Sequence, residues 1–283
     1  MSVAAGVVSG CLPLARPEPR HLPPVVTVVE YLNGVAAGVI VGFSLGLVGG
    51  GGSILAVPLM MYVVGVSDPH LAVGTSALAV SANAAAGVMS HARMGMVRWK
   101  IACSFAAVGA ASAWVGSLAG KGVAGPKLLV CFAGLMLLVG VMMLRGSQAR
   151  SAAAQPDRVS TPRIVAVGAL TGTVSGFFGI GGGFLIVPGL MYAAHLPILE
   201  AVGSALVVVA AFGLTTAVNY ARSGWVDWSL AAMLIGGGML GSVAGTRLAR
   251  RLSAIKGVLN RLYASVVFLV AFYMIARSGI QLP

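Results

Sequence analysis

The sequence predicts an all-α polytopic membrane protein that consists of two repeats, and three observations support this prediction. The chain of 283 residues is 58% hydrophobic and 8% charged, with a mean hydropathy of +0.98, whereas soluble proteins carry about 25% charged residues. Apolar stretches of about 20 residues, long enough to span a bilayer as helices, recur from Val25 to Ala276. Several motifs occur twice in the same order. The apolar runs do not alternate, which excludes a transmembrane β-barrel.

The repeats are defined by three pairs of matching segments. GLVGGGGSILAVP (46–58) matches GFFGIGGGFLIVP (176–188), LAVGTSALAV (71–80) matches EAVGSALVVV (200–209), and HARMGMVRW (91–99) matches YARSGWVDW (220–228). The copies lie about 130 residues apart, as expected for an internal duplication. The sequence thus divides into a Pro-rich, disordered tail (1–24), a first transmembrane repeat (25–146), a cytoplasmic linker (147–162) and a second transmembrane repeat (163–283).

Each repeat is expected to contain a helical hairpin broken by glycines and about three further transmembrane helices, which gives about eight to ten membrane segments in all. The apolar runs of the first repeat are 25–48, 52–66, 71–92, 99–120 and 127–144. Those of the second repeat are 164–179, 183–195, 200–221, 228–247 and 257–276. Several runs are too short to span a bilayer upright at 1.5 Å per residue.

The basic residues predict the orientation of the repeats. If each glycine-broken hairpin returns to its own side of the membrane, the loops on one side carry 12 of the 18 Lys and Arg residues. If it crosses once, the split is 11 against 7. Cytoplasmic loops carry the excess of Lys and Arg, so the charges favour inverted repeats with both termini outside. Inverted repeats are common in secondary transporters. The net charge of +12 is thereby explained by topology rather than by nucleic-acid binding.

Consecutive glycines within an apolar run predict two helix breaks. Backbone without helical hydrogen bonds is tolerated at membrane depth only where protein buries it or where it lines a cavity. We therefore expect two hairpin tips that point towards each other inside the protein. The free N–H groups and positive dipole end of the following helix would form an anion site there. The predicted substrate-binding glycines are Gly49, Gly50, Gly51, Gly52, Gly179, Gly181, Gly182 and Gly183.

Glycine can serve two other roles in such a chain. Gly34, Gly38, Gly42 and Gly46 recur at every fourth position, and Gly168, Gly172 and Gly176 repeat this spacing. Such stripes allow close helix packing in membranes, and we assign them to packing. A nucleotide-binding loop is not supported, because neither Lys-Ser/Thr after the glycines nor an acidic partner downstream of a strand–helix unit is present.

The glycine motif also carries a family resemblance. Gly176–Pro188 fully meets the pattern G-x-x-G-x-G-G-G-x-x-x-x-P, and Gly46–Pro58 departs from it at Gly50 and Ser53. With AVGTSA (72–77) and two copies of R-x-G-x-V-x-W, the chain resembles the TauE/SafE family of sulfite and organosulfonate exporters over nearly its whole length after residue 25. The resemblance implies a multi-pass transporter of the plasma membrane that moves small sulfur oxyanions or related organic anions.

Four polar side chains in the predicted helices are further candidates for substrate binding. Thr75 and Ser76, with Ser204 in the second copy, follow a glycine among small residues. Their hydroxyls could donate to an oxyanion or bond back to their own helix. Asn83 lies mid-helix where the second repeat has Phe212. Its amide could contact the substrate or link two helices.

Four charged residues are candidates for entry or coupling. Arg93 and Arg222 precede matching turns, where they could receive an anion or anchor the helices together with Trp99 and Trp228 of the aromatic belt. Glu30 and Glu200 are rare acids near apolar runs. They are candidates for proton coupling or for positions at the interface.

The favoured function is secondary transport of a small anion, with export of sulfite- or sulfonate-type compounds as the leading form. An importer or channel-like carrier of another organic anion, and a non-transporting assembly subunit, remain as alternatives. The partners expected are the anionic substrate, the lipid bilayer and, in a homo-oligomer, further copies of the chain. An enzyme is not expected, because the chain has four His residues but no HExxH motif and no nucleophile motif with a helical His partner. No catalytic residue, metal or cofactor is predicted.

Overall fold

The computed structural model describes residues 28–146, 161–179, 181–252, 268 and 272. Within these residues the secondary structure is helical and contains no strand, as the fold prediction requires. The predicted tail, the linker between the repeats and most of the last apolar run (257–276) lie outside the described residues.

The first repeat consists of a bent hairpin and three long helices. The hairpin comprises α1 (Val28–Val48), the 3₁₀ helix η1 (Gly49–Leu55), α2 (Ala56–Leu59) and the π-helical turn η2 (Met60–Val64). It is followed by α3 (Pro69–Arg93), α4 (Trp99–Lys121) and α5 (Gly125–Gly146). Asp68 caps α3, because its Oδ1 accepts a hydrogen bond of 2.8 Å from the backbone N–H of His70.

The second repeat follows the same order with a cleaner break. Its hairpin comprises α6 (Thr161–Phe178) and α7 (Gly183–Ala194), and it continues with α8 (Ile198–Arg222) and α9 (Trp228–Leu252). Asp227 caps α9 by accepting hydrogen bonds from the backbone N–H groups of Ser229 and Leu230 at 2.9 and 3.0 Å.

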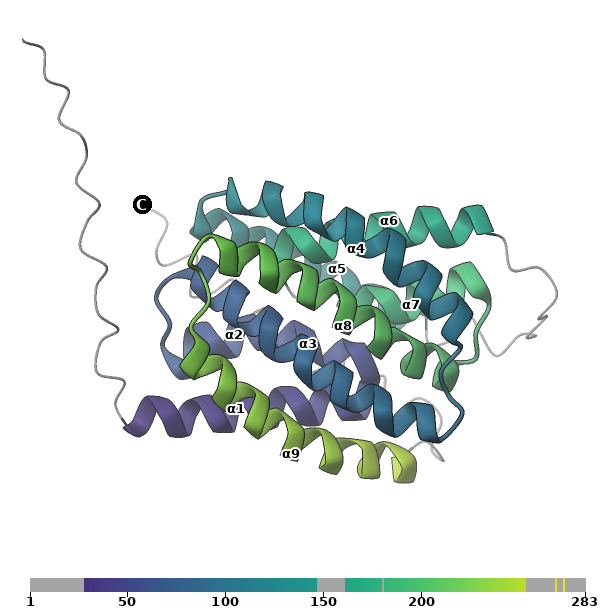
Figure 1. The fold of residues 1–283 in the computed structure, drawn as a ribbon, viewed down its shortest axis with the longest axis horizontal. Coiled ribbons are helices and arrows are strands. Elements are labelled where there is room, and N and C mark those ends of the chain that lie inside the picture. The colour runs from purple at the N-terminus through teal and green to yellow at the C-terminus, as the bar shows by residue number, and fades with distance from the viewer. Residues whose placement is uncertain (1–27, 147–160, 180, 253–267, 269–271, 273–283) are drawn as a thin grey trace, which may run out of the picture.

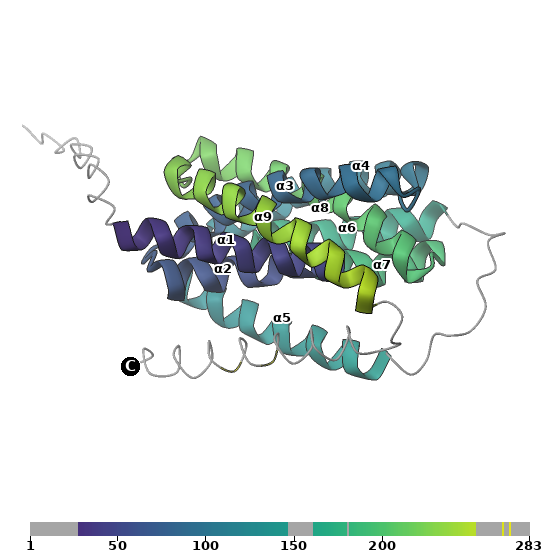
Figure 2. The same cartoon turned by 90° about the horizontal axis from the view of Figure 1, so that it is seen from below.

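The two repeats are interlaced rather than side by side. The central helices α3 and α8 pack against each other, α1 of the first repeat packs along α9 of the second, and α6 of the second packs along α4 of the first (Figure 1). Figure 2 shows α5 outside the layer formed by the other helices. The first helix of each hairpin thus packs along a long helix of the other repeat.

Glycine stripes make these crossed contacts possible. An ideal Cβ on Gly42 would collide with the carbonyl oxygen of Gly238, and one on Gly172 would collide with the carbonyl oxygen of Gly109. Gly46 and Gly176 meet backbone carbonyls in the same way. The predicted packing role of both stripes is therefore confirmed. Backbones this close gain van der Waals contact that larger residues would prevent.

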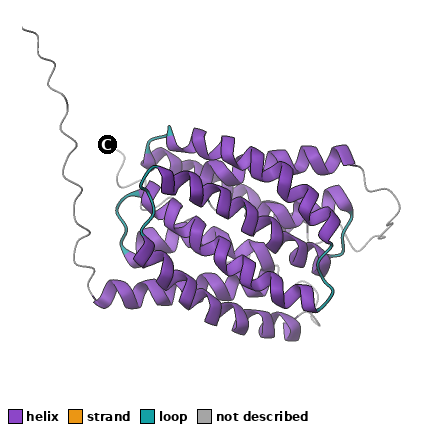
Figure 3. Cartoon of the chain, in the orientation of Figure 1, coloured by secondary structure: helices purple, strands orange, loops and turns teal. Residues whose placement is uncertain are grey.

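The described loops gather at two opposite ends of the bundle (Figure 3). One end holds the turns before α3, α5 and α9, and the other holds the turns before α4 and α8. In Figures 1 and 2, α1 begins at the first end whereas α6 begins at the second, so the hairpins enter from opposite ends. The ends of α3 and α9 and the beginnings of α4 and α6 lie towards the second end. These segments carry Arg93, Arg98, Lys100, Arg163 and Arg247.

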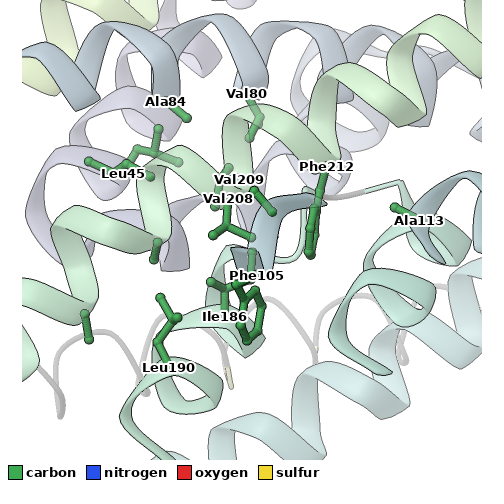
Figure 4. Packing of buried hydrophobic residues seen from close by; sticks show 14 of the residues in the cluster. Leu45, Val80, Ala84, Phe105, Ala113, Ile186, Leu190, Val208, Val209 and Phe212 are labelled. Carbon is green, nitrogen blue, oxygen red and sulfur yellow. The ribbon is translucent and has the colours of Figure 1, made fainter. Parts of the chain in front are cut away.

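The interior is packed with apolar side chains, and the exterior is apolar as well. Figure 4 shows the central cluster, in which Val80 of α3, Phe105 of α4, Ile186 of α7 and Val209 of α8 come together. On the outside, large apolar side chains such as those of Leu170 and Leu240 are exposed by 67% and 71%. Extended apolar surface of this kind fits contact with lipid rather than with water.

Four helices are long and apolar enough to cross a membrane within the described part of the chain. They are Pro69–Arg93, Trp99–Lys121, Glu200–Arg222 and Trp228–Leu248. The shorter apolar helices are Leu32–Leu47, Gly52–Val64, Lys127–Leu138 and Gly183–Ala194. Trp99 and Trp228 begin α4 and α9 with exposed side chains, as expected of residues at a membrane interface.

Candidate functional site: the glycine tips

The second glycine tip is a true helix break. After α6 ends at Phe178, Gly179, Gly181 and Gly182 have φ angles of 67°, 66° and 62°. These left-handed conformations suit glycine, because a Cβ would strain the backbone. Gly182 is the N-cap of α7 and offers no side chain to bond the first N–H groups of the helix. The start of α7 therefore keeps backbone donors that have no partner within the helix.

This tip is buried in the centre of the molecule. An ideal Cβ on Gly181 would lie 3.3 Å from side-chain carbons of both Val80 and Val209, which belong to the central cluster of Figure 4. One on Gly182 would lie 2.6 Å from the Oγ of Ser175. The uncapped end of α7 is thus enclosed between the central helices α3 and α8 and the end of α6.

The first glycine tip has a different geometry. The chain winds from α1 directly into η1, a 3₁₀ helix that contains Gly49–Gly52. Gly52 is not left-handed, and a Cβ there would collide with the backbone of Ser44 and Leu45 in α1. The glycines of the first repeat therefore let the chain fold back tightly on its own helix, whereas those of the second open a helix terminus.

Two of the predicted hydroxyls instead bind loops of the other repeat. Thr75 Oγ1 in α3 accepts a hydrogen bond of 3.0 Å from the backbone N–H of Asp227, and Ser204 Oγ in α8 accepts one of 2.9 Å from the backbone N–H of Arg98. The glycine before each hydroxyl, Gly74 or Gly203, leaves room for a carbonyl of the same loop. The G-T/S motif of each repeat therefore contacts the R-x-G-x-V-x-W motif of the other repeat.

Ser76 and Asn83 also have partners in the protein. Ser76 Oγ donates to the carbonyl of Val73 in its own helix at 3.1 Å, the alternative expected of such hydroxyls. Asn83 Nδ2 donates to the carbonyl of Leu234 at 3.3 Å and so links α3 to α9. Its Oδ1 is buried without a partner.

Glu200 forms an ion pair at the second end of the bundle. Its carboxylate accepts hydrogen bonds of 2.7 and 3.0 Å from Nε and an Nη of Arg98. The hydrogen bond and the charge of Glu200 raise the pKa of Arg98, so this guanidinium stays protonated. The sequence identified Glu200 but not its partner.

The remaining charged candidates lie at helix ends. Arg93 is exposed at the end of α3 and Arg222 is exposed at the end of α8, which lie at opposite ends of the bundle. The Cζ of Arg222 lies 5.1 Å from the centre of the Trp114 ring, a cation–π contact. Glu30 belongs to the first turn of α1, and its side chain lies outside the described part of the chain.

The structure adds polar groups that sequence reasoning missed. Ser175, Thr216 and Tyr220 each have a buried hydroxyl oxygen without a hydrogen-bond partner, and His70 has such a ring nitrogen. Lys121 lies close to this group, with Nζ 5.4 Å from the centre of the Tyr220 ring. Ser175 adjoins the tip motif in the sequence and could have been noticed there; the others depend on tertiary contacts. The described residues contain no group of His, Cys, Asp and Glu that could hold a metal ion.

Comparison with known proteins is consistent with this architecture. The family model described as sulfite exporter TauE/SafE matches residues 34–274. A probable membrane transporter protein of Xylella fastidiosa (strain 9a5c) is 49% identical over 259 residues, which cover 91% of this chain and 99% of the relative. The probable membrane transporter protein YdhB of Bacillus subtilis is 28% identical over 74% of this chain and 86% of its own length. No solved structure matches significantly. The chain therefore belongs to the TauE/SafE family of membrane transporters.

Proposed function

We propose that the protein is a secondary transporter that exports a small sulfur oxyanion of the sulfite or sulfonate type. Membership of a family described as sulfite exporters supports this substrate class. The relatives' names specify membrane transport alone. Transport needs no covalent step, and the sequence carries no nucleotide-binding motif that would indicate transport driven by ATP.

The observation that carries the proposal is the uncapped start of α7 in the centre of the bundle. The glycine tip before it is enclosed by Val80 of α3 and Val209 of α8, and the start of α7 carries the positive end of its helix dipole. Discontinuous helices of secondary transporters bind anionic groups in this way. We place the substrate beside Gly179, Gly181, Gly182 and Gly183, with Gly49–Gly52 of the first tip supporting the opposite wall.

The opposite entry of α1 and α6 supports inverted repeats. The second end of the bundle carries most of the described basic residues, among them Arg93, Arg98 and Arg247, whereas Lys121, Lys127 and Arg222 belong to helix ends at the first. On the positive-inside rule, we propose that the second end faces the cytoplasm and that both termini lie outside the plasma membrane. In this arrangement Arg93 and Arg222 lie at opposite mouths of the transport path. Glu200, joined to Arg98, and Glu30 remain proposals for coupling.

The substitution Gly182→Ala tests the site. A Cβ at this position requires a left-handed alanine and meets Ser175, so the start of α7 must shift. Purified protein in proteoliposomes is expected to lose most of its flux of radiolabelled sulfite, thiosulfate, sulfate or taurine. Gly236→Ala is the matched control, because no atom lies within 4 Å of its ideal Cβ. Its flux should equal that of the wild type.

Three results would overturn parts of the proposal. Equal flux in Gly182→Ala and wild type would remove the tip from the transport path. Flux of carboxylates such as acetate, with none for any sulfur anion, would favour the alternative of a carrier for other organic anions. No flux of any anion in folded, reconstituted protein would favour an assembly subunit.

A further inference from the structure

Several buried polar atoms of the described residues have no hydrogen-bond partner, and four of them lie in one region. They are His70 Nδ1, Ser175 Oγ, Thr216 Oγ1 and Tyr220 Oη; the fifth, Asn83 Oδ1, faces α9 instead. Ser175, Thr216 and Tyr220 are completely buried. Leaving a buried donor unpaired costs folding free energy, so a cluster of such groups is unfavourable unless a ligand satisfies them.

The cluster extends from the second tip towards the first end of the bundle. Ser175 Oγ lies 2.6 Å from an ideal Cβ on Gly182, and the Thr216 methyl group lies 3.6 Å from an ideal Cβ on Gly179. Tyr220 lies one turn beyond Thr216 on the same face of α8. The ring of His70 lies 6.3 Å from that of Tyr220 and stacks on Trp225 at 4.8 Å. The four groups thus lie between the start of α7 and the turn that precedes α9 at the first end of the bundle.

A positive charge lies beside the outer part of this cluster. Lys121 Nζ is 5.4 Å from the centre of the Tyr220 ring and 5.9 Å from that of Trp225. It donates hydrogen bonds of 2.7 Å to the carbonyl and side-chain oxygens of Asn219 and to Ser223 Oγ. None of these partners is a carboxylate, so within the described structure the ammonium forms no ion pair. A cation without a paired acid beside the cluster attracts an anion.

The first repeat lacks this set of donors. The positions that correspond to Ser175, Thr216 and Tyr220 are Leu45, Gly87 and His91. His91 Nδ1 already bonds to the carbonyl of Gly87 at 3.1 Å. The pseudo-symmetry of the fold therefore does not extend to these side chains. The polar groups belong to one tip alone.

We propose that Ser175, Thr216 and Tyr220 donate their hydroxyl hydrogen bonds to the transported anion, and that His70 is the outermost group of the same subsite. This inference rests on the proposed function. It makes the binding site asymmetric, because the anion is held by the second glycine tip alone, on the side of that tip that faces the first end of the bundle. Three hydroxyls and the backbone donors of α7 match a compact oxyanion with three or more acceptor oxygens. A halide, which has no set of separate acceptor oxygens, fits this arrangement poorly.

Single substitutions in the full-length, purified protein test the subsite. Ser175→Ala, Thr216→Val and Tyr220→Phe each remove one unpartnered hydroxyl and change little else. Thr215→Val is the matched control for Thr216→Val, because Thr215 Oγ1 already donates to the carbonyl of Ala211 at 2.8 Å. Thermal unfolding is measured without ligand and with sulfite, thiosulfate, sulfate, taurine, sulfoacetate, acetate or chloride. Dissociation constants follow from the ligand dependence of the unfolding temperature.

The expected result combines two readouts. Without ligand, the three variants should unfold at or above the wild-type temperature, because each loses a desolvated, unpaired group. With the sulfur oxyanion that stabilises the wild type, each should bind about tenfold or more weakly, as expected for a lost hydrogen bond to a charged ligand. Thr215→Val should bind as the wild type does. A purely structural role for the hydroxyls would instead lower the ligand-free unfolding temperature and leave affinity unchanged.

The outcomes separate this inference from the proposed function. If the wild type binds a sulfur oxyanion and all three variants bind it equally well, the subsite is wrong and the transporter proposal stands. If no oxyanion stabilises the wild type and none is transported in proteoliposomes, both fail. If chloride stabilises the wild type as strongly as the oxyanions do, the assignment to separate acceptor oxygens is overturned.

Discussion

At the scale of single residues, Lys121 has an unusual set of contacts for a lysine at the end of a membrane helix. Its ammonium group donates three hydrogen bonds to Asn219 and Ser223 at the end of α8. Asn219 in turn donates to Ser117 of α4. Lys121 therefore fixes the end of α4 to the end of α8, in addition to placing a positive charge near Tyr220.

The substitution Lys121→Met is expected to lower the free energy of unfolding by about 1–3 kcal/mol, because two oxygens of the buried Asn219 lose a charged donor. Lys127→Met removes an equal charge from an exposed position in α5 and should change stability by less than about 0.5 kcal/mol. Thermal unfolding of both variants in detergent measures the difference. Equal stability of the two would show that the contacts of Lys121 contribute nothing.

The sequence predicted the residues of the site unevenly. It identified the glycines of the second tip, because consecutive glycines in an apolar run are hard to reconcile with an unbroken helix. It also selected Thr75 and Ser204, whose hydroxyls instead receive N–H groups of loops about 150 and 100 residues away. Thr215 and Thr216 look alike in the sequence, and only tertiary packing determines that one hydroxyl is bonded and the other unpaired.

At the scale of helices, the glycine stripes determine how closely two helices can approach. Gly172→Ala should destabilise the protein by about 1–3 kcal/mol or more, because its Cβ would collide with the backbone of Gly109 and neither helix can move alone. Gly134→Ala in α5 is the control, since no atom lies within 4 Å of its ideal Cβ. It should be neutral or stabilising by up to about 1 kcal/mol.

Unfolding temperatures and the yield of folded protein distinguish the two glycine variants. A Gly172→Ala protein as stable as the wild type would contradict the close backbone contact between α4 and α6. If Gly172→Ala cannot be purified, Gly168→Ala offers a milder test, because its ideal Cβ lies 3.4 Å from the carbonyl oxygen of Phe105.

Helix boundaries were predicted well and helix type less well. The predicted apolar run 99–120 corresponds to the helix Trp99–Lys121, and the predicted run 183–195 corresponds to the helix Gly183–Ala194. Long apolar runs and the turns between them determine these limits. The sequence did not predict that the first tip would continue as a 3₁₀ helix, since both tips have almost the same glycines and differ in their contacts with the preceding helix.

At the scale of the whole molecule, the charge distribution makes a prediction about topology. In a variant without native cysteines, Ser67→Cys lies in the turn before α3 and Pro197→Cys in the turn before α8. A membrane-impermeant maleimide applied to intact cells should label Ser67→Cys but not Pro197→Cys. After permeabilisation both should react, because both positions are exposed.

The labelling experiment has a clear contrary result. Labelling of Pro197→Cys alone would reverse the orientation. Labelling of both variants in intact cells would place the two ends of the bundle on one side and refute the inverted arrangement. The duplication itself was predictable from repeated motifs, but the exchange of partners between the repeats was not, because the same motifs would also fit two repeats packed side by side.

The crossed pairing of α1 with α9 and of α4 with α6 has a consequence for synthesis of the protein in the cell. When the ribosome has completed the first repeat, the partners of α1 and α4 have not yet been made. Their glycine faces can meet only lipid at that stage, and the contacts made by Thr75 and Arg98 have no counterpart. The N-terminal half therefore cannot mature ahead of the C-terminal half. Insertion into the membrane is sequential, whereas tertiary folding waits until α9 has emerged.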